Sequence, residues 1–197
     1  MSPASQQIAA AIGGWLAEMS GAQVVPPAPL VGSPAPLVVS PTPLVPLVVA
    51  IDGHGAAGKT TIAAELAVAL GAKVVHTDDY FYEAAEGGDP RPMAQYYAWE
   101  LLREEALEPA IRSSREAAGS GGGASAVILV EGVSSAAPAL ADLISRAVFV
   151  QTPEPVRLAR LHERISDEEW DEEWLYAERL YFASRPPDTF DLVVAGV

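Results

Sequence analysis

Cysteine is absent from the 197-residue chain, so the sequence provides neither disulfide bonds nor thiolate metal ligands. Positive charge is scarce, since 12 Lys and Arg residues stand against 26 Asp and Glu residues, and the net charge is -14. Because nucleic acids and anionic membranes attract basic surfaces, we expect neither as a partner. No apolar run reaches the roughly 20 residues that a membrane-spanning helix needs. The first Lys or Arg is Lys59, so we expect no signal or transit peptide and a cytoplasmic location.

The length and composition predict one globular domain with a short N-terminal addition. Hydrophobic residues make up 50% of the chain and charged residues 19%, which is typical of a folded protein. Apolar residues with helical spacing predict an amphipathic helix within residues 1–22, which packs on the main domain or alternatively binds a partner. Eight prolines between Pro26 and Pro46 predict an extended linker over residues 23–46. Residues 47–197 then form the main domain.

Short apolar runs alternate with helical segments throughout the main domain. This alternation predicts βαβ units with right-handed crossovers, and therefore an α/β fold whose parallel sheet has helices on both faces. The expected strands are residues 47–52, 73–76, 126–130, 147–151 and 190–194. The expected helices are residues 58–70, 93–118, 137–145, 154–165 and 167–184, and residues 119–125 form a Gly-rich linker.

A phosphate-binding loop is the most specific motif. Residues 53–60 read GHGAAGKT, which fits G-x-x-x-x-G-K-[ST] at every fixed position, between an expected strand and an expected helix. In such a loop the backbone N–H groups bind phosphates, Lys59 reaches the β- and γ-phosphates, and Thr60 binds Mg²⁺. We expect Asp52 to make local hydrogen bonds and His54 to fill the loop. The expected nucleotide-binding residues are Gly53, Gly55, Ala56, Ala57, Gly58, Lys59, Thr60 and Thr61.

Acidic residues follow the second and third expected strands, at the sheet edge where ligands bind in open α/β folds. Asp78 is the candidate base for an acceptor hydroxyl, or a carboxylate that holds Mg²⁺ through water. Glu131 follows four apolar residues and is placed to hold a water on Mg²⁺. The neighbouring Asp79 is a substrate contact or a helix cap. The expected metal ligands are Thr60, Asp78 and Glu131, and the expected substrate contacts are Asp79, Tyr80 and Tyr82, although these aromatic residues could equally belong to the core.

Three arginines, Arg157, Arg160 and Arg164, follow the fourth expected strand. At 100° per residue they share a helix face roughly 60° wide. This placement predicts a lid, about residues 157–184, that closes over phosphates and stabilises transferring charge. The alternative is surface pairing with the acidic residues between 167 and 173. Trp170 and Trp174 are one helical turn apart within that acidic run, and we expect them to pack this helix.

Four segments together resemble the uridine kinase-like branch of the P-loop small-molecule kinases. They are the loop VAIDGHGAAGKTT, the segment HTDDYFY, the strand end ILVEGV, and the closing strand DLVV. The resemblance covers residues 47–197 and implies a three-layer P-loop fold with sheet order 2-3-1-4-5 and an Arg-bearing lid. It also implies phosphorylation of a hydroxyl, usually a ribose 5′-hydroxyl, with ATP and Mg²⁺. By the matching motifs, Asp78 corresponds to the base and Glu131 to the acid of the third strand.

One departure from this family concerns the acceptor. Many relatives carry an aromatic-Asp-Trp triplet between the second and third strands, and residues 83–125 contain none. The sequence therefore supports an ATP-dependent kinase for a hydroxyl-bearing small molecule, a nucleoside such as uridine being one candidate. A nucleoside monophosphate kinase is disfavoured, because Asp78 and Asp79 would repel a phosphorylated acceptor. A non-catalytic nucleotide-binding module is the other alternative. The acceptor, the choice between ATP and GTP, and the oligomeric state, a homodimer included, stay open.

Overall fold

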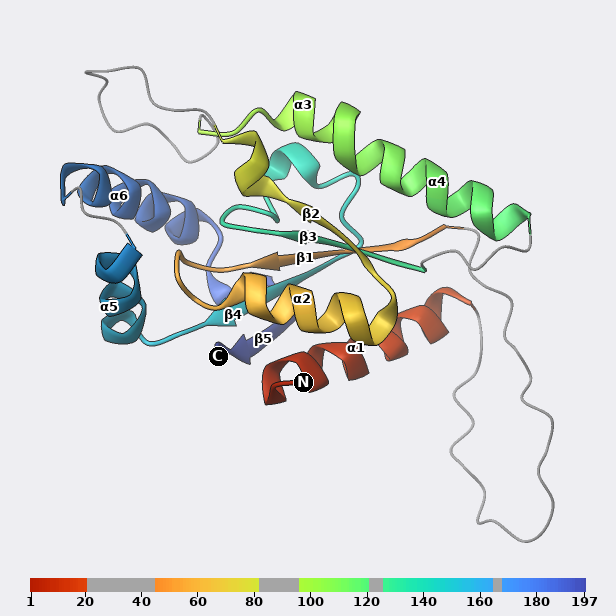
Figure 1. Cartoon of the computed structure of the whole chain (residues 1–197), viewed down its shortest axis with the longest axis horizontal. Helices are drawn as coiled ribbons and strands as arrows, with labels where there is room; N and C mark the ends of the chain where they lie inside the picture. Colours follow the sequence, from red (N-terminus) through yellow and green to blue (C-terminus); the bar gives the residue numbers. More distant parts are fainter. Residues whose placement is uncertain (21–44, 82–95, 121–125, 165–167) are drawn as a thin grey trace, which may run out of the picture.

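A five-stranded parallel sheet forms the centre of the protein (Figure 1). The computed structural model describes residues 1–20, 45–81, 96–120, 126–164 and 168–197. The sheet order is β2-β3-β1-β4-β5, which confirms the predicted fold class and strand order. The strands are β1 (Leu47–Asp52), β2 (Lys73–His76), β3 (Val127–Glu131), β4 (Arg146–Gln151) and β5 (Leu192–Ala195).

The two faces of the sheet carry separate cores, because successive residues of a strand point to opposite faces. In β1, Val49 and Ile51 belong to one core, and Val48 and Ala50 belong to the other. Helix α2 (Lys59–Leu70) packs in the first core, and buried residues between Tyr96 and Ile111 pack in the second. All six β1 residues are buried, as expected for a central strand covered on both faces.

The N-terminal helix α1 (Pro3–Met19) packs on the main domain beside α2 (Figure 1). Ile8 and Ile12 are fully buried in the same core as α2. The Ser2 backbone N–H and hydroxyl both donate to Glu65 Oε2 of α2, at 2.7 and 2.8 Å. The predicted packing of this helix is therefore confirmed. The proposed linker falls largely on residues 21–44, outside the described residues.

Two predicted helices differ from the structure. Residues 137–145 contain only the short 3₁₀ turn η4 (Pro138–Leu140), because the chain must reach the start of β4, where Ser145 bonds both to and from Val48. The helix expected over 93–118 begins at Trp99, because Tyr97 makes an antiparallel bridge with Phe81 and is held extended.

From Trp99 the chain is helical through α3 (Trp99–Leu102), the π-helical turn η3 (Arg103–Leu107) and α4 (Glu108–Gly119). Pro109 lies just after the π-helical turn, and the chain stays helical through it to Gly119. Two more helices, α5 (Glu154–Arg164) and α6 (Glu168–Ser184), lie beside the carboxyl end of β1 in Figure 1. No helix within the described residues is long and apolar enough to cross a membrane.

Candidate functional site

The loop between β1 and α2 adopts a backbone that only small residues allow. Gly53 has φ +143°, and a Cβ there would lie 2.5 Å from the carbonyl oxygen of Val150. Gly58 has φ +93° and precedes the first residue of α2. Ala56 is one of two described non-glycine residues with positive φ, at +58°. The loop therefore curls tightly before the helix N-terminus, which is the geometry that presents N–H groups to phosphates.

Lys59 is buried within this loop, with only 7% of its surface exposed. Its Nζ donates to the carbonyl oxygens of Gly53 at 2.9 Å and of His54 at 2.8 Å. The ammonium thus lies across the first half of the loop, where a phosphate oxygen could replace a carbonyl partner.

Asp52 anchors the loop to the segment after β3. The carboxylate is fully buried and accepts hydrogen bonds from the backbone N–H groups of Gly53, Ser134 and Ala136 at 2.7–3.1 Å. It also accepts from the Tyr181 hydroxyl at 2.7 Å. Burial raises the pKa of Asp52, although these hydrogen bonds and Lys59 oppose the shift. The local hydrogen-bonding role predicted for Asp52 is confirmed, and it extends to α6 through Tyr181.

Thr60 and Glu131 meet at the carboxyl edge of the sheet. The Thr60 hydroxyl donates to Glu131 Oε1 at 3.1 Å, and His76 Nδ1 lies 2.8 Å from the same oxygen. A hydroxyl beside a carboxylate fits Mg²⁺, which takes one or two protein oxygens, waters and phosphate oxygens rather than a cage of protein ligands. The described residues include no group of three His, Cys, Asp or Glu side chains that could hold a metal ion by themselves.

Asp78 lies in the 3₁₀ turn η1 (Thr77–Tyr80) that directly follows β2. Its Oδ1 lies 3.4 Å from the position that a Cβ on Gly132 would occupy, so it is next to the residue after Glu131. Part of the side chain is open to solvent, yet the surrounding protein desolvates the carboxyl and raises its pKa. Lys59 opposes this shift, and Glu131 adds to it. Asp78 thus lies beside Glu131 and within electrostatic reach of Lys59.

Two arginines of α5 reach the same region. Arg157 is 5% exposed, and its guanidinium lies 3.4 Å from Glu154 and 3.4 Å from Glu178. Arg160 donates to the carbonyl oxygen of Ala56 in the loop at 3.2 Å. Arg157 and Arg160 are therefore next to the phosphate-binding loop, as a lid requires, while the side chain of Arg164 lies outside the described residues.

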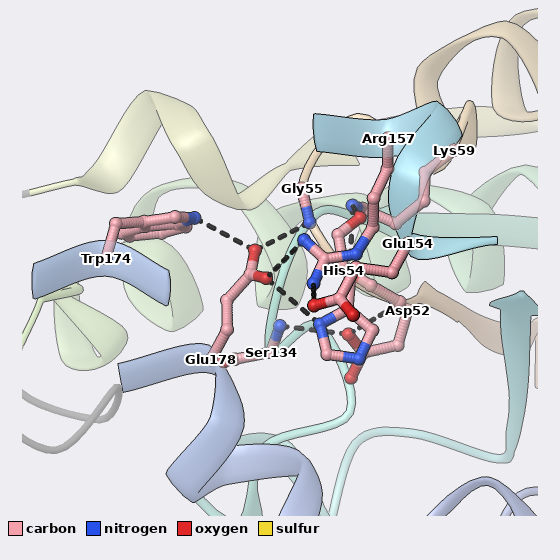
Figure 2. Close-up of polar contacts among 10 residues, drawn as sticks. Asp52, His54, Gly55, Lys59, Ser134, Glu154, Arg157, Trp174 and Glu178 are labelled. Atoms are coloured by element: carbon pink, nitrogen blue, oxygen red, sulfur yellow. Dashed lines mark hydrogen bonds and ion pairs between the residues drawn. The ribbon is translucent and has the colours of Figure 1, made fainter. Parts of the chain in front are cut away.

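Glu178 of α6 connects these elements (Figure 2). The carboxylate is fully buried and accepts from the Gly55 N–H at 2.6 Å and from Trp174 Nε1 at 2.9 Å. His54 Nδ1 lies 3.0 Å from its other oxygen, and because a carboxylate only accepts, this nitrogen carries the proton. Burial would raise the pKa of Glu178, but the hydrogen bond and charge of His54, the Gly55 N–H and Lys59 lower it overall.

The sequence did not identify Glu178 or the role of His54. His54 is more than loop filler, since its ring also lies 4.2 Å from the ring of Phe182, centroid to centroid. Trp174 is buried, as predicted for a packing residue, and it also bonds Glu178. The four-residue spacing of Trp174 and Glu178 places both on one helix face, and this spacing was the available signal for their contact. Glu178 follows a run of acidic residues, however, and such a run is typical of a solvent-exposed helix face.

Aromatic residues pack near the expected acceptor side. The rings of Phe81 and Tyr96 are stacked, with centroids 5.9 Å apart, and Trp174 approaches both of them edge-on. Tyr80 and Phe81 are partly buried against the core, and Asp79 is exposed. Tyr80 and Phe81 thus contribute to the core, and Tyr82 lies outside the described residues.

Comparisons with known proteins support the fold. The sequence matches no protein-family model and no curated protein. Its structure is similar to a possible uridine kinase from Bacillus stearothermophilus, with a TM-score of 0.54, 20% sequence identity, and coverage of 76% of this chain and 88% of that one.

Two further solved structures give lower TM-scores. A sugar kinase from a Janibacter species has a TM-score of 0.44 at 17% identity, covering 76% of this chain and 85% of that one. A shikimate kinase from Bacteroides thetaiotaomicron has a TM-score of 0.41 at 16% identity, with 76% and 86% coverage. At 20% identity, the likeness to the Bacillus stearothermophilus structure shows a shared fold alone.

Proposed function

We propose that this chain is an ATP-dependent kinase that transfers the γ-phosphate to a hydroxyl of a small molecule. The observation that carries the proposal is the convergence of different residue types at one edge of the sheet. The loop holds Lys59, the end of β3 places Glu131 on Thr60, and the end of β2 places Asp78 next to them. A pure nucleotide-binding module needs the first of these groups but has no use for a base.

In the proposed reaction, the loop N–H groups and Lys59 bind the β- and γ-phosphates of ATP. Thr60, and Glu131 through water, would hold Mg²⁺, which would neutralise charge at the phosphates when bound. Asp78 accepts the proton of the acceptor hydroxyl, the hydroxyl oxygen forms a bond to the γ-phosphorus, and the bond from that phosphorus to the bridging oxygen breaks. ADP leaves with the electron pair of that bond.

The arginines of α5 supply positive charge at the site. Arg160 donates to the carbonyl oxygen of Ala56 in the loop. The buried Arg157 contacts Glu178, which in turn accepts the Gly55 N–H of the loop. Guanidinium groups near transferring phosphoryl oxygens stabilise the charge that develops there. We propose that α5 and α6, about residues 157–184, act as the lid, with Arg164 as a third candidate.

The acceptor class rests on charge. Asp78 and the exposed Asp79 lie side by side at the mouth of the site, where they would repel a phosphorylated acceptor and activate a hydroxyl. A neutral polyol or nucleoside, with uridine as the first candidate, fits this better than a nucleoside monophosphate. The non-catalytic alternative is favoured only by the missing aromatic-Asp-Trp triplet in residues 83–125.

Mass spectrometry of reaction products tests the proposal. The full chain is incubated with ATP, Mg²⁺ and one acceptor at a time: uridine, cytidine, adenosine, nicotinamide riboside, pantothenate or a simple sugar. A product heavier by one phosphoryl group is expected for one acceptor class. Asp78→Asn should lose this product while ATP binding stays within a few-fold, and Asp188→Asn, at an exposed position, should retain it. Unchanged turnover in Asp78→Asn would contradict the role of Asp78 as base.

A further inference from the structure

An acidic side chain occupies a donor of the phosphate-binding loop. Glu178 Oε1 accepts the backbone N–H of Gly55 at 2.6 Å, with both groups buried (Figure 2). The lack of a side chain at Gly55 permits this approach, since a Cβ there would lie 2.9 Å from the same oxygen. Loops of this kind direct their N–H groups at phosphate oxygens. The Glu178 carboxylate therefore accepts a hydrogen bond from the Gly55 N–H, a donor that could otherwise bind an anionic ligand.

The position of Lys59 indicates which phosphate is concerned. Its Nζ bonds the carbonyl oxygens of Gly53 and His54, the two residues that precede Gly55. The lysine of such a loop reaches the β- and γ-phosphates, while the N–H groups nearer the helix cradle the inner phosphates. Gly55 thus lies at the outer end of the loop, on the side of the γ-phosphate.

Glu178 also restrains an arginine of the proposed lid. Arg157 Nη1 lies 3.4 Å from Glu178 Oε2, and both side chains are buried. The other partners of the carboxylate, His54 and Trp174, come from the loop and from α6. The carboxylate is kept ionised, because its hydrogen bonds and Lys59 lower its pKa despite its burial. One negative charge therefore joins the outer end of the loop to α5 and α6.

We propose that the Glu178 carboxylate is a positioning group that takes the place of a γ-phosphate oxygen on the Gly55 N–H, so that ATP displaces it and frees Arg157 to approach the transferring phosphoryl group. ADP has no γ-phosphate and leaves the carboxylate in place. The inference rests on the proposed nucleotide site. It adds a device by which the chain distinguishes the substrate nucleotide from the product nucleotide.

Tryptophan fluorescence of the full chain tests the displacement without altering Glu178. Trp174 Nε1 donates to Glu178 Oε1, so loss of that contact changes the surroundings of the indole. A non-hydrolysable ATP analogue with Mg²⁺ should change the fluorescence, and ADP with Mg²⁺ at saturation should not. The response should disappear in Trp174→Phe and persist in Trp15→Phe, a matched change on α1. An equal response to both nucleotides would overturn the inference.

Calorimetric affinities of a charge-removing variant give a second readout. Glu178→Gln keeps the shape but weakens the competing acceptor, so affinity for the ATP analogue relative to ADP should rise about tenfold, the difference between a charged and a neutral hydrogen bond. Glu172→Gln, an exposed position on the same helix, should leave the ratio unchanged. Equal weakening for both nucleotides would show that Glu178 only supports the loop, and would overturn the inference. If the wild-type chain binds neither nucleotide, the proposed function itself fails.

Discussion

Replacing Asp52 is expected to destabilise the protein strongly, because one carboxylate serves four buried donors. In Asp52→Ala the N–H groups of Gly53, Ser134 and Ala136 and the Tyr181 hydroxyl all lose their acceptor. At about 1 kcal/mol or more for each lost buried hydrogen bond, the gross loss is about 4 kcal/mol. Because burial raises the pKa of Asp52, the variant also removes the cost of a buried charge, and we expect a net loss of about 3 kcal/mol.

Asp52→Asn removes the negative charge but keeps one acceptor oxygen, so it separates the effect of the charge from that of the hydrogen bonds. The amide oxygen can still accept from Gly53 and Ser134, which share Oδ1, and the Tyr181 hydroxyl can turn to accept from the amide nitrogen. Only the Ala136 N–H then faces a donor, so the expected loss is about 1–2 kcal/mol.

Urea unfolding at neutral pH, followed by circular dichroism, measures both variants. Asp188→Asn, at an exposed position, serves as the matched control and should unfold at the wild-type midpoint. The order of stability should be wild type, then Asp52→Asn, then Asp52→Ala, with similar urea dependence for all. Wild-type stability in Asp52→Ala would refute the role of Asp52 as an anchor of the loop.

Three further predictions concern helix α1, the loop backbone and the metal. Hydrogen bonds from the Ser5 and Ser2 side chains and the Ser2 backbone lower the pKa of Glu65 to about 2. This stabilisation is present above the unfolded pKa near 4.5 and is lost as the pH falls toward 2. The hydrogen-exchange protection factors of the α1 amides should therefore fall over that range in the wild type but not in Glu65→Gln, and equal pH dependence in both would contradict the role of Glu65. Gly53→Ala should abolish nucleotide binding, measured by calorimetry, because its Cβ would collide with the Val150 carbonyl oxygen; wild-type affinity would contradict the loop geometry. Removing Mg²⁺ with EDTA should stop turnover, and Thr60→Val should raise the Mg²⁺ concentration for half-maximal activity; an unchanged Mg²⁺ dependence would exclude Thr60 as a ligand.

The strands and their parallel arrangement were predictable from the sequence, because each strand is a short apolar run and the elements alternate; the strand order came from the family resemblance. Local pattern was insufficient where distant contacts decide the backbone. Residues 137–145 have a helical composition, yet Ser145 is held by Val48 of β1. The helix after residue 93 begins late because Tyr97 pairs with Phe81.

The candidate site was predictable where a motif specifies it and not where packing creates it. Gly53, Lys59 and Thr60 belong to a spaced pattern whose chemistry is general. Glu178 belongs to no such pattern, because its importance comes from the close approach of α6 to Gly55. In the sequence, only its spacing of four residues from Trp174 marks Glu178, and only the fold brings its carboxylate to the loop.

The release of ADP from ATP, with and without an acceptor, tests the proposed kinase activity most directly. The full chain is supplied with ATP and Mg²⁺, then with each acceptor in turn, and Lys59→Ala serves as the blank. We expect ADP release to be stimulated by one acceptor class in the wild type and not in Lys59→Ala. If the wild type binds ATP but no acceptor stimulates release above the blank, the kinase assignment is contradicted and the non-catalytic nucleotide-binding module becomes the better account.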